Sequence, residues 1–268
     1  MKLSITLAKE AGESAPIVFR GSYIDNIKKA AQMGYDAVEI HVNDPCSLDI
    51  NEIQKACEEN RISISTLGTG MGFVIDGLSF TDPDSSIREN AVLRIKEDIE
   101  AAKKLNAMVI IGSMRGTIPD LKDYEKYEEH AIECSKKVMH HAEKNEVVVV
   151  MEAINRYETN FINNVEEGLG FLDKISSPYL KLHLDTFHMN IEEVDLCNSI
   201  EFAGSALGHF HFADSNRWSP GYGHIDFRKI IDSLKNIQYN GYISFECLPL
   251  PTQDEAAKKA INHIKALS

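Results

Sequence analysis

Four side chains of the kinds that bind divalent cations occur at regular intervals in the second half of the chain. They are Glu152, Asp185, His211 and Glu246, and they lie in or end the apolar runs VVVVME, LKLHLD, LGHFHF and YISFE. Three carboxylates that meet one imidazole in an empty site would repel one another, and a divalent cation removes that cost. Oxygen-rich ligation with one nitrogen suits Mn²⁺, Mg²⁺ or Co²⁺ better than a metal that prefers thiolates. The sequence therefore predicts one bound divalent cation, with Mn²⁺ as the first choice.

Such a cation could do chemistry on a hydroxy-ketone. Four protein ligands would leave about two positions of an octahedral cation open. Two neighbouring oxygens of a hydroxy-ketone fit those positions, where the cation would polarise the carbonyl as a Lewis acid. Taken singly, each of the four residues is more often a cap, a loop contact or a satisfied core histidine. Their occurrence together on successive apolar runs indicates a site.

The four residues can meet only if the strands that carry them are neighbours. Eight apolar segments rich in Val and Ile predict parallel strands, at residues 3–7, 37–41, 62–67, 108–112, 147–152, 180–185, 207–213 and 242–246. Helical spacing fills the intervals, at residues 24–33, 53–59, 87–105, 124–145, 165–175, 192–203, 227–235 and 254–266. Asp84 or Ser85 should cap the third helix, and Gly34 should close the first.

Eight strand–helix units predict an α/β fold in which residues 1–268 form a single (β/α)₈ TIM barrel. Chemistry in such a barrel lies at the carboxyl ends of the strands, where all four residues would converge. The length of 268 residues fits one barrel without remainder. A doubly wound open sheet is the competing architecture, but it more often uses fewer strands.

The composition excludes several classes of protein. The net charge of −13 argues against nucleic acid as a partner, because phosphate binding needs clustered Lys and Arg. Five cysteines without CxxC spacing argue against a disulfide framework or a thiolate zinc site, and favour a reducing compartment, the cytoplasm. We expect no signal peptide and no membrane segment, since no apolar run is long enough.

Three longer motifs resemble one family. The segment 152–158, EAINRYE, resembles the ExxNRxE motif of the ketose 3-epimerases, which are xylose-isomerase-like TIM barrels. The segment 184–193 reads LDTFHMNIEE, and HFHFADSNR at 209–217 is followed by PGYG at 220–223, as in that family. The resemblance covers essentially the whole chain. It implies a metal-dependent enzyme that inverts the carbon next to the ketone of a small keto-sugar or keto-sugar acid through a cis-enediolate, and that works as a homodimer or homotetramer.

The resemblance also implies roles for single residues. The positions that match the family's metal ligands are Glu152, Asp185, His211 and Glu246. The two glutamates among them match its acid/base pair, one carboxylate for each face of the reacting carbon. The positions that match residues holding substrate oxygens are Glu158, His188 and Arg217. Strand alternation places His183 and His209 one layer deeper than Asp185 and His211, as a second shell around the cation.

One arginine departs from the plain ketohexose epimerases. Arg115 follows the fourth predicted strand in the segment IIGSMRG, and an arginine at the rim would pair with a carboxylate on the substrate. Together with the tail SFECLPLP, this residue makes the chain more similar to the branch that acts on keto-sugar acids, such as 5-keto-L-gluconate epimerase. The alternative is that Arg115 lies on a solvated loop or bridges an acidic neighbour.

Other functions remain to be separated from this one. Aldose–ketose isomerisation, as in hydroxypyruvate isomerase, would use the same cation and both glutamates. An endonuclease-IV-like role would need more rim histidines and a basic face. A sugar-binding module would not need both Glu152 and Glu246. The glycine run Gly68, Gly70 and Gly72 lacks the spacing of a dinucleotide site, and no helix is expected directly after it.

Overall fold

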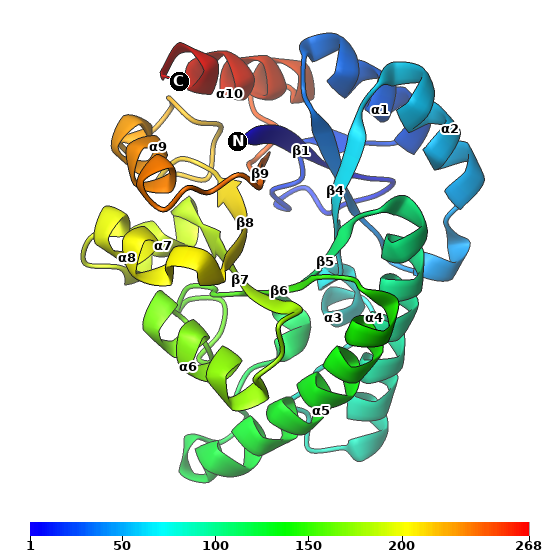
Figure 1. Cartoon of the computed structure of the whole chain (residues 1–268), viewed down its shortest axis with the longest axis vertical. Coiled ribbons are helices and arrows are strands. Elements are labelled where there is room, and N and C mark those ends of the chain that lie inside the picture. The colour runs from blue at the N-terminus through cyan, green and yellow to red at the C-terminus, as the bar shows by residue number, and fades with distance from the viewer. Residues whose placement is uncertain (268) are drawn as a thin grey trace.

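The computed structural model describes residues 1–267, and its centre is a closed parallel barrel (Figure 1). All but one of the nine strands of the sheet form the barrel, in sequence order, and pairing of β1 with β9 closes it. The barrel strands are β1 (Lys2–Ala8), β3 (Ala37–His41), β4 (Ser63–Gly68), β5 (Met108–Ile111), β6 (Val149–Glu152), β7 (Leu180–Asp185), β8 (Leu207–Phe212) and β9 (Tyr242–Phe245). The predicted α/β barrel is confirmed.

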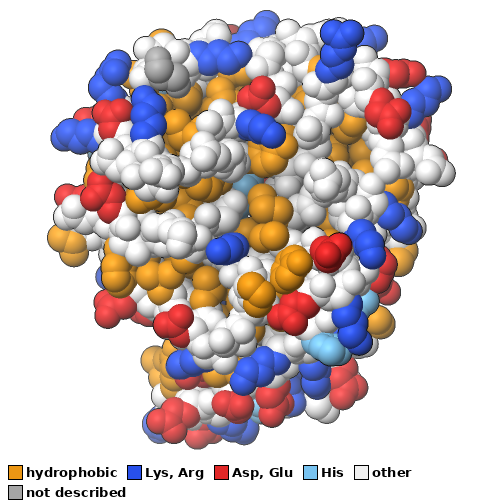
Figure 2. All heavy atoms as spheres, in the orientation of Figure 1, with side chains coloured by type: hydrophobic (Ala, Val, Ile, Leu, Met, Phe, Trp, Pro, Cys, Tyr) orange, Lys and Arg blue, Asp and Glu red, His pale blue; other side chains and the backbone are white. Residues whose placement is uncertain are grey.

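A ring of helices surrounds the barrel (Figure 1). The helices are α1 (Tyr23–Met33), α2 (Ile50–Asn60), α3 (Gly70–Val74), α4 (Ser85–Leu105), α5 (Tyr124–Asn145), α6 (Val165–Ile175), α7 (Thr186–Glu192), α8 (Leu196–Ala203), α9 (Phe227–Asn236) and α10 (Gln253–Leu267). Single 3₁₀ turns occur at Pro45–Ser47, Ser113–Arg115, Leu121–Asp123 and Gly204–Ala206. Acidic and basic side chains are interspersed around the rim of the face in Figure 2, with apolar side chains nearer its centre.

Local sequence explains where several helices begin and end. The Asp84 carboxylate accepts a hydrogen bond from the Ser86 N–H and so caps α4, as the sequence predicts. Gly34 ends α1 with a φ of 86°, a left-handed conformation that glycine adopts without strain. The strands are buried on both faces because the helices cover the outside and packed side chains fill the inside.

The structure differs from the predicted elements in three places. The predicted helix 192–203 begins only at Leu196, as α8, because α7 ends at Glu192, Glu193 is extended and Asp195 caps α8 through the Asn198 N–H. The short helix α3 opens directly after β4, where no helix was expected. A two-residue strand, β2 (Phe19–Arg20), pairs with β1 outside the barrel. None of the helices described combines the length and hydropathy needed to cross a bilayer.

Candidate active site

The carboxyl ends of four neighbouring strands bring the predicted ligands together. Glu152 ends β6, Asp185 ends β7, His211 lies in β8, and Glu246 directly follows β9. All four side chains are buried. Ligand atoms of Asp185, His211 and Glu246 lie within 4.8 Å of one another. Glu152 belongs to two further groups with the same spacing, one with Asp185 and His188 and the other with His183 and His211. The four residues thus form overlapping groups around one region.

Unsatisfied polar atoms mark the centre of this region. The Asp185 Oδ2 and His211 Nδ1 atoms are buried without a hydrogen-bond partner and lie 4.0 Å apart. The Glu246 Oε2 atom lies 3.7 Å from the same His211 Nδ1. Buried polar atoms without partners are costly, and a cation between these atoms would satisfy all of them. The donor set of carboxylate oxygens and one imidazole nitrogen therefore fits a divalent cation.

The two glutamates differ in protonation when no cation is present. Burial raises the pKa of Glu152 to about 8, and the charges of Glu246 and Asp185 add to that rise. Burial would also raise the pKa of Glu246, but the charge and hydrogen bond of His211, with Arg217, hold it well below its usual range. One carboxyl group is thus protonated at neutral pH while the other is ionised. Environments that separate two carboxyl pKa values in this way are typical of acid/base pairs.

Glycine makes room for one of these carboxylates. A Cβ atom at Gly112, directly after β5, would lie 2.6 Å from the Glu152 Oε2 atom. Since real Cβ contacts are never that short, a side chain at this position would displace the Glu152 carboxylate. Gly112 therefore helps to set where Glu152 can lie.

Arg217 connects the carboxylates at the rim. Its guanidinium donates to Glu246 Oε2 at 2.8 Å and to Glu158 Oε1 at 3.0 Å. It also stacks on the Phe187 ring, 4.6 Å from the ring centroid. The Arg217 φ of 60° is unusual for a residue with a side chain. This backbone geometry and both ion pairs fix a charged guanidinium beside the centre.

His188 lies on the other side of the centre, next to Glu152. Its Nε2 atom is 3.7 Å from Glu152 Oε1, and its Nδ1 atom is 2.7 Å from the Asn155 amide nitrogen. Because an amide nitrogen only donates, Nδ1 accepts and Nε2 carries the proton. Burial, followed by the charge of Arg217, holds the pKa of His188 well below its usual value. His188 is therefore a neutral donor that points into the site.

A layer of polar side chains lies beneath the ligands. His183 and His209 are fully buried there, as strand alternation predicts. They are joined by Glu39 of β3, which is not among the residues predicted at the strand ends. Burial would raise the pKa of Glu39, but the charge of His211 and hydrogen bonds from three histidines hold it well below its usual range.

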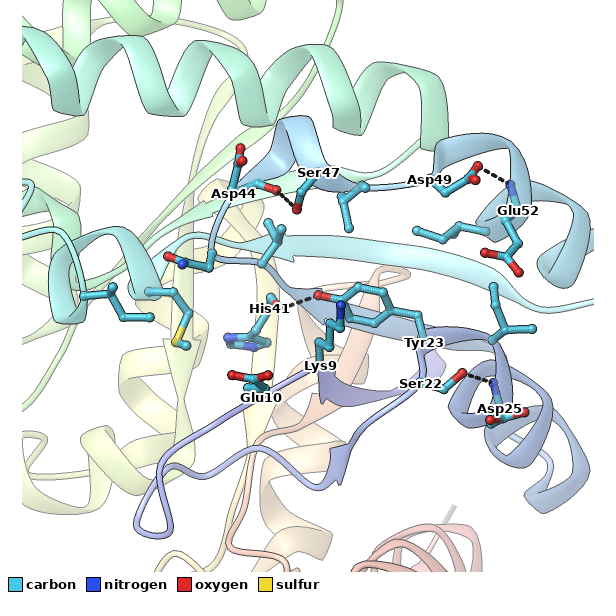
Figure 3. Close-up of a pocket in the computed structure, with 17 residues that line it drawn as sticks. Lys9, Glu10, Ser22, Tyr23, Asp25, His41, Asp44, Ser47, Asp49 and Glu52 are labelled. Carbon is cyan, nitrogen blue, oxygen red and sulfur yellow. Dashed lines mark hydrogen bonds between the residues drawn. The ribbon is translucent and has the colours of Figure 1, made fainter.

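A groove of about 760 Å³ opens beside His41 at the carboxyl ends of β1 and β3 (Figure 3). In Figure 3, Tyr23 and His41 lie between the segment that carries Lys9 and Glu10 and the segment that carries Asp44 and Ser47. The His41 Nε2 atom lies 3.8 Å from Glu246 Oε1, so His41 separates the groove from the candidate active site. A Cβ atom at Gly68 would lie 2.7 Å from His41 Nδ1, which explains the glycine there.

Comparison with known proteins places this geometry in a family. The sequence model described as "Xylose isomerase-like TIM barrel" matches residues 27–267. The chain belongs to the xylose isomerase-like TIM barrel family. It is 34% identical over 231 residues to D-psicose 3-epimerase of Ruminiclostridium cellulolyticum, covering 82% of this chain and 76% of that protein. It is 33% identical over 221 residues to L-ribulose 3-epimerase of Methylomonas sp., with the same coverage.

A more distant relative and a solved structure extend the comparison. The 3-dehydro-D-guloside 4-epimerase of Escherichia coli is 25% identical over 241 residues, covering 85% of this chain and 88% of that protein. The crystal structure of D-psicose 3-epimerase with D-tagatose from Clostridium cellulolyticum H10 superposes with a TM-score of 0.85. That match is 28% identical and covers 100% of this chain and 99% of the other. The barrel and most of its length are therefore shared with named sugar epimerases.

Arg115 does not lie on an open rim of this xylose isomerase-like barrel. Its side chain has no exposed surface, and its guanidinium donates to the backbone carbonyls of Gly112, Phe161 and Ile162 at 3.0–3.1 Å. Burial lowers its pKa to about 10, so it stays charged at neutral pH. The location expected from the sequence is wrong, because the 3₁₀ turn that carries Arg115 directs its side chain under the segment 159–163. This geometry indicates a structural role.

Proposed function

We propose that the protein is an epimerase that inverts the carbon next to the ketone of a small keto-sugar, using one divalent cation. The observation that carries the proposal is the pair Glu152 and Glu246, which reach one buried centre from strands separated by β7 and β8. The names of the relatives, which are 3-epimerases and a 4-epimerase of sugars, support this class of reaction.

The candidate ligands are Glu152, Asp185, His211 and Glu246, and Mn²⁺ suits their donor set best among the common cations. A divalent cation bound there would polarise the ketone and make the neighbouring C–H more acidic. The unsatisfied Asp185 and His211 atoms support this placement.

The two glutamates would move the proton. A carboxylate on one face of the carbon takes the proton, and a carboxylic acid on the opposite face returns one, so the configuration inverts. Glu152 and Glu246 suit these two tasks because they reach the centre from different strands, and their roles exchange in the reverse reaction. Because each carboxylate has two oxygens, ligation and proton transfer by one glutamate can coexist.

Three further side chains would hold the substrate. The neutral His188 donates from Nε2 beside Glu152, and the Arg217 guanidinium stabilises negative charge that develops on the ketone oxygen. Glu158, which accepts from Arg217 and from Asn155, would hold a neighbouring hydroxyl group. The part of the substrate remote from the reacting carbon would extend past His41 into the groove of Figure 3.

The test is to incubate the Mn²⁺-loaded protein in D₂O with D-tagatose, D-fructose and 5-keto-gluconate, and to resolve the products by chromatography and NMR. We expect a C3 or C4 epimer with deuterium at the inverted carbon. An aldose product would instead identify aldose–ketose isomerisation. Glu152→Gln and Glu246→Gln should each abolish turnover, and full activity in either variant would refute the two-carboxylate mechanism.

The same proposal includes a homodimer or homotetramer. Light scattering coupled to size-exclusion chromatography measures the mass directly, and a 30.0 kDa species would contradict this part of the proposal.

A further inference from the structure

Glu39 lies at the bottom of the candidate active site, across the barrel from His211. It is fully buried on β3, whereas His211 belongs to β8. The two strands are not neighbours in the sheet, so contact between them crosses the inside of the barrel. A buried carboxylate without partners is strongly destabilising, because its charge has been removed from water without compensation. Its presence therefore requires compensating hydrogen bonds.

Those bonds come from four side chains. His41 Nε2 and His209 Nε2 each lie 2.8 Å from a Glu39 oxygen, and the Thr66 hydroxyl donates at 2.6 Å. The His211 Nε2 atom lies 3.0 Å from both oxygens of the same carboxylate. Four donors converge on one acceptor-only group, which is the environment that an ionised carboxylate requires.

This arrangement decides which nitrogen of His211 faces the cation. An ionised carboxylate only accepts, so His211 must donate to it from Nε2, and the neutral ring, which is the form that binds a cation, then has no proton on Nδ1. The lone pair that binds a cation is then left on Nδ1, the buried atom without a partner beside Asp185 and Glu246. A ligating histidine that donates its other N–H to a carboxylate has a fixed tautomer and ring orientation.

We propose that Glu39 is the positioning residue of the cation site: it fixes the Nε2–H tautomer and the ring orientation of His211 so that Nδ1 points at the cation. The inference rests on the cation site of the proposed function, but not on which sugar the protein converts. Glu39 does not touch the reacting atoms, so its effect reaches the reaction only through His211.

The test uses Glu39→Gln, with Thr66→Val as the matched control. An amide keeps the shape of the carboxylate, but it carries no charge and only its one oxygen accepts, so the four donors around Glu39 compete for that oxygen and His211 is no longer held by two acceptors. Thr66→Val removes a different hydrogen bond to the same carboxylate and leaves His211 alone. Calorimetric titration with Mn²⁺ should show affinity about 10–100-fold weaker for Glu39→Gln and unchanged for Thr66→Val. Urea unfolding of both variants without cation separates this effect from general destabilisation.

A second measurement needs no variant. Long-range ¹H–¹⁵N spectra of the Mg²⁺-saturated wild-type protein should show the His211 ring protonated at Nε2 and not at Nδ1. The opposite tautomer would overturn the proposal, and so would wild-type Mn²⁺ affinity in Glu39→Gln or an equal loss in Thr66→Val. Neither readout requires turnover. A protein that binds Mn²⁺ through His211 yet epimerises no sugar would therefore refute the proposed function and leave this inference intact.

Discussion

Replacing Arg115 by lysine should destabilise the barrel rather than change its substrate preference. The guanidinium donates to three buried carbonyls at once, and one of the residues that accept, Ile162, has a φ of 58°. A lysine ammonium lacks the planar fork and can satisfy about one of the three carbonyls. Because Gly112 and Ile162 also accept from the backbone N–H groups of Arg115 and Ile154, only the Phe161 carbonyl can be left without a partner. A buried carbonyl without a partner costs about 1–3 kcal/mol, which is the expected loss and a sizeable part of a typical total stability of about 5–15 kcal/mol.

The assay is urea unfolding followed by far-ultraviolet circular dichroism. Arg156→Lys is the matched control, because the Arg156 side chain is 60% exposed and lysine can keep the ion pair with Glu192. We expect this control to lose less than about 1 kcal/mol.

Turnover of a keto-sugar acid and of a neutral ketose should be measured on the same preparations. Arg115→Lys should lower both activities in proportion to the folded fraction. Wild-type stability combined with a selective loss of kcat/KM for the acid would refute the structural role, because it would mean that the guanidinium contacts a substrate carboxylate.

Three other predictions follow from the same structure. Asp98→Asn should stabilise the protein at neutral pH, because both oxygens of this buried carboxyl lack hydrogen-bond partners and burial raises the pKa of Asp98 well above its usual range. A carboxyl whose pKa is higher in the folded state than in the unfolded state destabilises the protein as pH rises above the unfolded-state pKa. The stability gained by Asp98→Asn, measured by urea unfolding, should therefore grow from pH 4 to pH 8. A gain that does not depend on pH would contradict the reasoning. Mn²⁺ at a hundred times its Kd should raise the free energy of unfolding by about 2.7 kcal/mol. Thermal scans with and without EDTA measure this stabilisation, and Mn²⁺ should not stabilise the Asp185→Asn variant. Leu48→Trp, which narrows the groove, should raise KM for a keto-sugar about tenfold with kcat unchanged, and steady-state kinetics showing an unchanged KM would place the substrate elsewhere.

The sequence predicted the fold well because its signals are local. Apolar runs define each barrel strand, and caps such as Asp84 and Gly34 mark helix ends. The exception is the predicted helix 192–203, where Asp195 captures the Asn198 N–H and starts a separate helix. A side chain that competes with the backbone in this way is not visible in hydrophobic spacing.

The candidate site was predictable only in part. Residues at the ends of successive strands had to converge once the barrel closed, which is why Glu152 and Asp185 could be named. The position of Arg115 could not be predicted, because its partner carbonyl at Phe161 is far along the chain and fixed by tertiary packing. Glu39 was missed, although the signal was present: a lone glutamate in the middle of the apolar strand AVEIH. A charge within a buried strand predicts a paired, functional carboxylate.

The groove and the ligands occupy different parts of the chain. The groove is built from the segments that follow β1, β3 and β4, whereas the candidate ligands lie in or directly after the last four strands, β6 to β9. Exchange of residues 9–25 or 42–53 for the matching loops of another barrel of this fold should therefore alter which molecules are accepted while the reactive groups stay in place. The amino-terminal portion is the natural starting point for laboratory evolution of new specificities, and libraries can leave the carboxyl-terminal portion untouched.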